Sequence, residues 1–164
     1  MYNASVPIFV KTLGNLSAIL DKGAAFAAEK KIEQSVLMGY RIAPDMFTFA
    51  KQVQSAADHA KGATARLAGM EPPAYEDTEK TFDELKARIA KTLAFIDTVK
   101  PAQIEGSETR EIVLKFGTNT RTMVGQTYLL HNAIPNFFFH TTTAYAILRH
   151  CGVNIGKRDF IGQL

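Results

Sequence analysis

The sequence contains one cysteine, Cys151, and therefore cannot form a disulfide within the chain. Nothing in its cysteine content points to an oxidising compartment. The first residues, MYNASVPIFVKTLG, also lack a basic segment followed by an unbroken apolar stretch, so no signal peptide is predicted. We expect a soluble, cytoplasmic protein.

Basic stripes and phosphate-binding loops are also absent from the sequence. Lysine and arginine total 19 against 16 acidic residues, which gives a formal charge of +3. The two signs are interleaved, as in EKTFDELKARIAK, and such mixing is typical of solvated helix faces rather than of nucleic-acid interfaces. The glycines of GNLSAILDKG and GVNIGK lack the spacing of a phosphate-binding loop. We therefore expect no nucleic-acid partner.

Charged side chains are missing from one long stretch, Thr122 to Leu148. A membrane span needs about 20 mostly apolar residues. Here, however, glutamine, asparagine, histidine and threonine side chains interrupt the stretch, and Pro135 lies in its middle. We predict a helix that is buried on most sides by its neighbours, with no membrane contact.

The residues that are present predict a helical protein. With 164 residues, of which 46% are hydrophobic and 21% charged, the chain has the size and composition of one globular domain, 1–164. Apolar residues recur at helical spacing over 5–31. Ser5 is expected to cap this first helix, and Val10 is expected to face the core.

Two further helices are predicted from their start and stop signals. One opens at Ala-Pro-Asp, residues 43–45, with Pro44 in its first turn. The next is capped by Asp77 or Thr78 and ends before Pro101. Its acids come early and its bases later, which suits the helix dipole.

The pattern changes from helical spacing to alternation between residues 110 and 124. The alternating side chains are Ile112, Leu114 and Phe116 on one face with Val113 and Lys115 on the other. The sequence GTNT then supplies a turn, so we predict a short β-hairpin.

The last helix covers at least residues 136–151. A start near Thr127 with a kink at Pro135 is also compatible with the pattern. Together these elements predict an all-α four-helix bundle with a small β-hairpin before the last helix.

One histidine, His140, lies inside the apolar helix PNFFFHTTTAYAILRH. Residues four apart share a helix face, so Asn136 lies beside it. In the second helix, His59 lies between Ala56 and Ala63, at the edge of the buried face. The two histidines could meet in the core. Spacing alone leaves two hypotheses open: buried polar residues with hydrogen-bond partners, or ligands of a metal ion.

Three segments carry a family resemblance: APDMF, ADHAKGATARLAG and IPNFFFHTTTAYAILRHCGVNIGKRDF. They resemble a bacterial family of unknown function, which is similar in turn to the DinB/YfiT-like superfamily of four-helix bundles. The resemblance covers nearly the whole chain and implies a DinB-like fold.

The resemblance also implies a metal site. In metal-binding members of the superfamily, one histidine comes from the second helix and two come from an H-x-x-x-H pair on the fourth. Carried over, the ligands of a divalent ion such as zinc or nickel would be His59, His140 and Asn136. Asn136 stands where the family has the first histidine of the pair. An asparagine carbonyl is a poor substitute for imidazole, so the site is expected to be degenerate.

Three functions remain open from the sequence. The first is binding of a small ligand in the degenerate core site. The second is a metal-dependent transferase or hydrolase that uses His59 and His140, so whether the chain is an enzyme stays undecided. The third is a structural, homodimeric bundle without a site. The phenylalanines 137–139 cannot all face one core, so we expect one of them to meet another element or a second copy.

Overall fold

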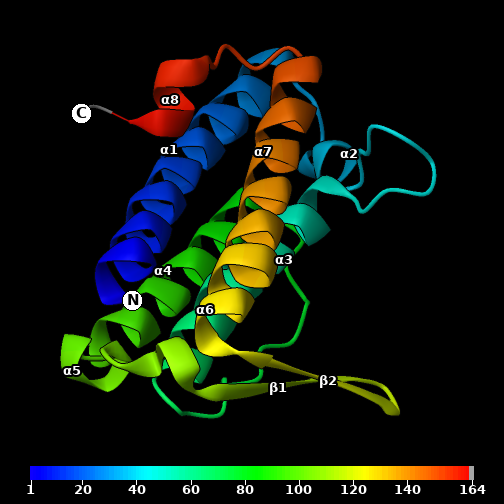
Figure 1. Ribbon diagram of the computed structural model, residues 1–164. Helices are drawn as coiled ribbons and strands as arrows, with labels where there is room; N and C mark the ends of the chain where they lie inside the picture. The colour runs from blue at the N-terminus through cyan, green and yellow to red at the C-terminus, as the bar shows by residue number, and fades with distance from the viewer. Residues whose placement is uncertain (163–164) are drawn as a thin grey trace.

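Four long helices form the body of the protein (Figure 1). The computed structural model describes residues 1–162, and for Phe116 it describes the backbone alone. The long helices are α1 (Val6–Lys30), α3 (Phe49–Leu67), α4 (Phe82–Thr98) and α7 (Ile134–His150). Helix α3 packs against α4 and α7, and α1 packs against the same two helices from the other side. The chain is therefore mostly helical, as predicted.

Short helical segments precede, connect and follow the long helices. They are η1 (Tyr2–Ala4), α2 (Gln34–Met38), α5 (Pro101–Ile104), η2 (Ser107–Thr109), α6 (Gly125–Tyr128) and α8 (Lys157–Ile161). The predicted count of four helices thus applies only to the long ones. None of the helices within residues 1–162 has both the length and the apolar character needed to cross a bilayer.

The core lies between the long helices. Its largest fully buried side chains include Phe9, Phe49, Phe82 and Phe137. The rings of Phe9 and Phe137 meet edge to face at 4.9 Å between centroids, which joins α1 to α7. Phe9 occupies the position expected for Val10, whose side chain is 42% exposed. The prediction for Val10 was wrong because the buried stripe of α1 passes from Val6 through Phe9 to Leu13, which leaves Val10 beside it.

The predicted starts of two helices were wrong. Helix α3 begins at Phe49 rather than at residues 43–45, because the Thr48 hydroxyl accepts a hydrogen bond from the backbone N–H of Lys51. Helix α4 begins at Phe82, where Thr81 and Glu84 form a capping box that satisfies two backbone N–H groups.

Ser5 precedes α1, as predicted, but it does not cap the helix. Its hydroxyl instead donates to the carbonyl oxygens of Met1 and Tyr2. The short turn η1 places these two carbonyls within reach, and they compete with the helix for the hydroxyl.

The hairpin is confirmed. Strands β1 (Glu111–Phe116) and β2 (Asn119–Val124) pair antiparallel, with Glu111 opposite Val124. Ile112 and Leu114 are buried, and Val113 and Lys115 are exposed, as the alternation predicts. The side chain of Phe116 lies outside the described residues. The hairpin extends away from one end of the helices (Figure 1).

The last helix has the earlier of its two predicted starts. Helix α6, a π-helical segment η3 (Leu129–Ala133) and α7 follow one another without a break. Pro135 has no N–H to donate to the carbonyl of His131, so the regular hydrogen-bond ladder cannot pass through this turn. The wider π turn just before Pro135 accommodates the proline.

Candidate functional site

His59 on α3 and His140 on α7 meet where these two helices pack together. Their rings stack with 5.3 Å between centroids and 17° between planes. The side chain of His140 is buried, and that of His59 is partly buried. The structure therefore brings together the two histidines that the resemblance singles out.

Gln52 orients His140. The Nδ1 atom of His140 lies 2.7 Å from Oε1 of Gln52, which is itself buried on α3. Because the amide nitrogen of Gln52 donates to the carbonyl of Phe47, its oxygen is the atom that faces the imidazole. The proton of His140 is then on Nδ1, and Nε2 keeps a free lone pair. The Phe47 ring stacks on the same imidazole at 6.1 Å.

Burial keeps both imidazoles neutral. Burial, with the neighbouring His140 as a smaller cause in the same direction, lowers the pKa of His59 to about 4. Burial also lowers the pKa of His140, with a smaller effect of Lys51 in the same direction. At pH 7 each ring can thus accept a hydrogen bond or coordinate a metal without first losing a proton.

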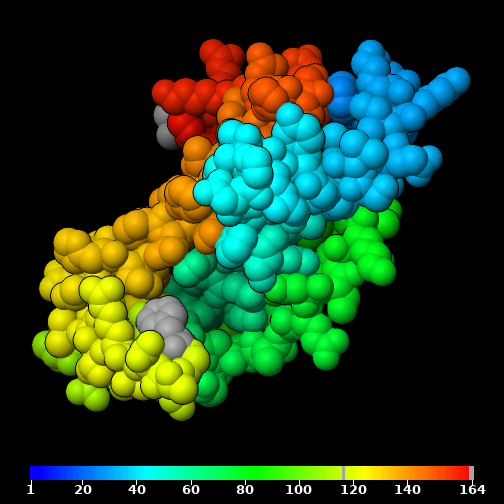
Figure 2. Space-filling model, turned by 90° about the vertical axis from the view of Figure 1, so that its right-hand side faces the viewer, coloured from blue at the N-terminus to red at the C-terminus, as the bar shows by residue number. Residues whose placement is uncertain are grey.

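Two hollows meet at His59. The first, of about 370 Å³, is lined by Phe47, Lys51, Ser55, Asp58, His59, Arg66 and His140. The second, of about 170 Å³, is lined by His59, Arg66, Leu114, Lys115, Tyr128, Asn132 and Asn136. His59 and Arg66 are common to both. Figure 2 shows this face of the molecule, where α3 lies between the segment that precedes it and the hairpin.

Asn136 lines the second hollow together with His59, whereas His140 lines the first. The Asn136 side-chain nitrogen donates to the carbonyl oxygen of Asn132 at 2.7 Å. A resident divalent ion would therefore find two imidazoles and one amide oxygen, rather than three strong ligands. Across residues 1–162, no three His, Cys, Asp or Glu side chains are arranged to hold an ion. The residues do not fit a tightly held metal.

Arg66 and Tyr128 also belong to this site, but no sequence pattern singled them out as site residues. Nη1 of Arg66 lies 3.3 Å from the Tyr128 hydroxyl, which is buried and has its pKa raised by burial. One signal could have found Arg66. It follows His59 by seven residues, which places it on the same face of α3.

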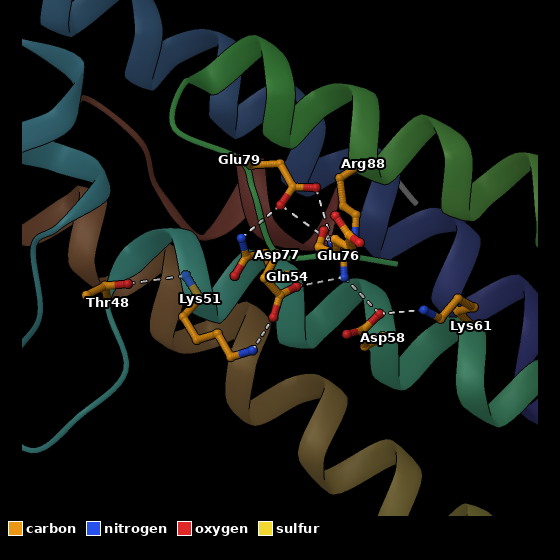
Figure 3. Close-up of polar contacts among 9 residues, drawn as sticks. All are labelled: Thr48, Lys51, Gln54, Asp58, Lys61, Glu76, Asp77, Glu79 and Arg88. Atoms are coloured by element: carbon orange, nitrogen blue, oxygen red, sulfur yellow. Dashed lines mark hydrogen bonds and ion pairs between the residues drawn. The ribbon is translucent and has the colours of Figure 1, made fainter. Parts of the chain in front are cut away.

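A buried arginine on α4 organises the opposite side of α3 (Figure 3). The Arg88 guanidinium contacts Asp58 at 3.0 Å, Asp77 at 3.1 Å and Glu79 at 3.1 Å. It also donates to the carbonyl of Glu76 at 2.9 Å. The network therefore ties the irregular segment before α4 to both α3 and α4.

Two lysines complete the network. Lys51 pairs with Asp77, and Lys61 pairs with Asp58 at 2.7 Å. Since Lys51 and Asp58 also line the first hollow, the network fixes one wall of the candidate site. Sequence patterns did not indicate this network, because its members come from α3, α4 and a loop.

Comparisons with known proteins agree on one family. A family model described as a domain of unknown function, DUF1993, matches residues 1–161. The crystal structure of a DinB family member protein from Shewanella denitrificans, at 1.83 Å resolution, is similar, with a TM-score of 0.93 and 41% sequence identity. The match covers 99% of this chain and 92% of that chain. None of the curated proteins matches.

Proposed function

Because the chain belongs to the DUF1993 family, a DinB-like family of unknown function, we propose that it binds a small molecule in the hollows that meet at His59 and Arg66. One observation carries the proposal: these two side chains line both hollows. Concave sites with aromatic walls and a few convergent polar groups are where proteins bind small ligands. Here the convergent groups are two neutral imidazoles, a guanidinium and a phenol.

A fragment screen tests this proposal. Uncharged aromatic and heteroaromatic fragments should bind the wild type, as measured by thermal shift and by protein-observed NMR. A fragment present at 100 times its dissociation constant adds about 2.7 kcal/mol to the free energy of unfolding. His59→Leu should abolish the shift for most of the hits, because it removes the polar group shared by both hollows.

His131→Gln is the matched control for this screen. It removes an exposed imidazole from the same chain and should leave every hit unchanged. Hits that bind equally well to His59→Leu, or a screen without hits, would rule out these hollows as the site.

A metal-dependent transferase or hydrolase is the second candidate function. One observation favours it: two imidazoles, which are common ligands of divalent ions, lie next to each other with 5.3 Å between their ring centroids. The lowered pKa values of both rings also remove the competition from protons near neutral pH. The missing third ligand weighs against it, and a substitution at Asn136 tests it.

We further propose that a second copy of the chain packs on the outer face of α7. Phe137 is buried, but Phe139 is 56% exposed. The face has no charged residue between Arg121 and Arg149. A stable dimer buries about 800 Å² per partner, which a face of this length can supply.

Phe139→Glu is expected to convert this dimer into a monomer, because it places two carboxylates in an apolar interface. Light scattering coupled to size-exclusion chromatography measures the change in mass. Val10→Glu, which replaces a 42% exposed apolar residue on α1, should leave the dimer intact. A monomeric wild type at high concentration would contradict the proposal.

A further inference from the structure

Arg66 lies where three hollows meet. Besides the two hollows at His59, it lines a third of about 490 Å³, between the end of α3 and strand β1. Gly69, Met70, Arg110 and Ile112 are among the residues that line this third hollow. Arg66 is thus the side chain that all three hollows share.

The hydrogen-bonding capacity of Arg66 is largely unused. A guanidinium has five N–H donors, and buried or partly buried ones usually bind carboxylates. Within residues 1–162, the only side-chain partner of Arg66 is the Tyr128 hydroxyl. The ion pairs of that part of the chain do not include Arg66. Arg88, on the other side of α3, shows the contrast, because three carboxylates surround it.

The acids near Arg66 do not neutralise it. Asp58 lines the first hollow, but its carboxylate is paired with Lys61 and Arg88. Glu71 and Glu111 line the third hollow without forming an ion pair with Arg66. The second hollow, in contrast, contains Lys115 and no acid. An anion at Arg66 would therefore meet a positive surrounding on the side of the second hollow.

Gly62 makes room for the guanidinium. This glycine is buried in the middle of α3, where glycine weakens a helix relative to alanine. Its backbone is helical, so no unusual dihedral angle requires glycine there. A Cβ atom at this position would overlap Nη1 of Arg66, one turn further along the helix. The missing Cβ lets the guanidinium lie against α3, where its one side-chain hydrogen bond within residues 1–162 is to the Tyr128 hydroxyl.

We infer that Arg66 is the anchor for the carboxylate of a small organic acid, with the body of the acid in the hollows beside His59. The inference rests on the proposed function and names the class of its ligand. A planar guanidinium matches a carboxylate through two parallel hydrogen bonds. Leu114 and Tyr128 offer apolar surface to the rest of the molecule, and neutral His59 offers a hydrogen bond.

Matched acids and amides test the inference. Benzoate and other small aromatic and aliphatic carboxylates are titrated by NMR into the wild-type protein, each beside its uncharged amide, for example benzamide. At least one acid should bind about tenfold or more tightly than its amide. The amide lacks the charged hydrogen-bond pair with Arg66, and losing one such pair is expected to weaken binding by about this factor. Arg66→Gln should remove this preference, and Arg66→Lys should restore only part of it.

Two glycine variants separate the anchor from general effects on α3. Gly62→Ala should weaken binding of the acid, because the new methyl group displaces the guanidinium. Gly14→Ala is the matched control, since a Cβ atom there meets nothing within 4 Å. Both changes replace a helical glycine by alanine, which favours the helix. A difference in acid binding between the two variants therefore reports on the position of the Arg66 guanidinium. If Arg66→Gln does not fold, Gly62→Ala still tests whether acid binding depends on the Arg66 guanidinium.

Three results would overturn the anchor. They are equal binding of acids and amides, unchanged acid binding in Arg66→Gln and Gly62→Ala, or no binding of any acid at millimolar concentration. Binding of inorganic phosphate at Arg66 without binding of any carboxylate would also overturn it, because the class of anion would differ. If uncharged fragments still bind in a manner that depends on His59, the proposed function stands without the anchor.

Discussion

Replacing Arg88 by methionine should lower the free energy of unfolding by about 3 kcal/mol, as measured by urea denaturation. The guanidinium is 2% exposed and is shared by Asp58, Asp77 and Glu79. Methionine fills much of the same space but leaves the three carboxylates close together without their common cation. Removing one partner of a buried ion pair typically costs 3–5 kcal/mol. We expect about the lower end, because Asp58 and Asp77 are 40% and 34% exposed and can be hydrated.

Lys86→Met is the control for this prediction. Lys86 lies on the same helix and pairs with Asp21, and the two side chains are 34% and 60% exposed. Its replacement should cost at most about 1 kcal/mol, since exposed ion pairs contribute little. Equal losses for the two variants would mean that Arg88 is no more than a surface charge. A loss at Arg88 would also loosen Lys51 and Asp58, so ligand binding in the first hollow should weaken with it.

The sequence predicted those helices and strands whose formation depends on residues close together in the chain. The apolar spacing over residues 5–31 follows from a helix with one buried face, and α1 buries Leu13, Leu16 and Leu20. The alternation at Ile112 and Leu114 likewise predicted the hairpin. Patterns of this kind depend on neighbouring residues, so a single sequence is enough to find them.

Helix starts could not be predicted in the same way, because they depend on competition between caps. Asp77 is a good capping residue by type. In the structure its carboxylate is bound to Arg88 and Lys51, which the fold brings to it, and Thr81 caps α4 instead. The long-range ion pairs decided where the helix begins.

The candidate site was predicted only in part for a similar reason. Helical spacing and the family resemblance pointed to His59 and His140, but no pattern in the sequence showed that Gln52 would orient one of them. Arg66 and Gly62 appear in the sequence as one charged and one small residue of a helix. Their relation became visible only when the glycine was seen to leave space for the guanidinium.

Asn136→His should create a metal site that the wild type lacks. The change rebuilds an H-x-x-x-H pair with His140 on α7, and its side chain enters the hollow that Asn136 shares with His59. Three imidazoles are a good ligand set for zinc or nickel. At 100 times its dissociation constant, the ion should add about 2.7 kcal/mol to the stability. In a domain of this size that corresponds to a rise in Tm of about 5–10 °C, measured with and without the metal.

The double variant Asn136→His with His59→Leu is the control, and it should lose the metal-dependent rise in Tm. Because the pKa of His59 is about 4, protons should compete little with the ion above pH 6. Tight binding of one equivalent by the wild type would mean that two imidazoles and the Asn136 amide suffice, and the metal-dependent enzyme would become the better hypothesis. If neither protein responds to metal, the three side chains do not reach one ion. His140 would then be a core histidine held by Gln52, and the hollows beside it would have to act without a metal.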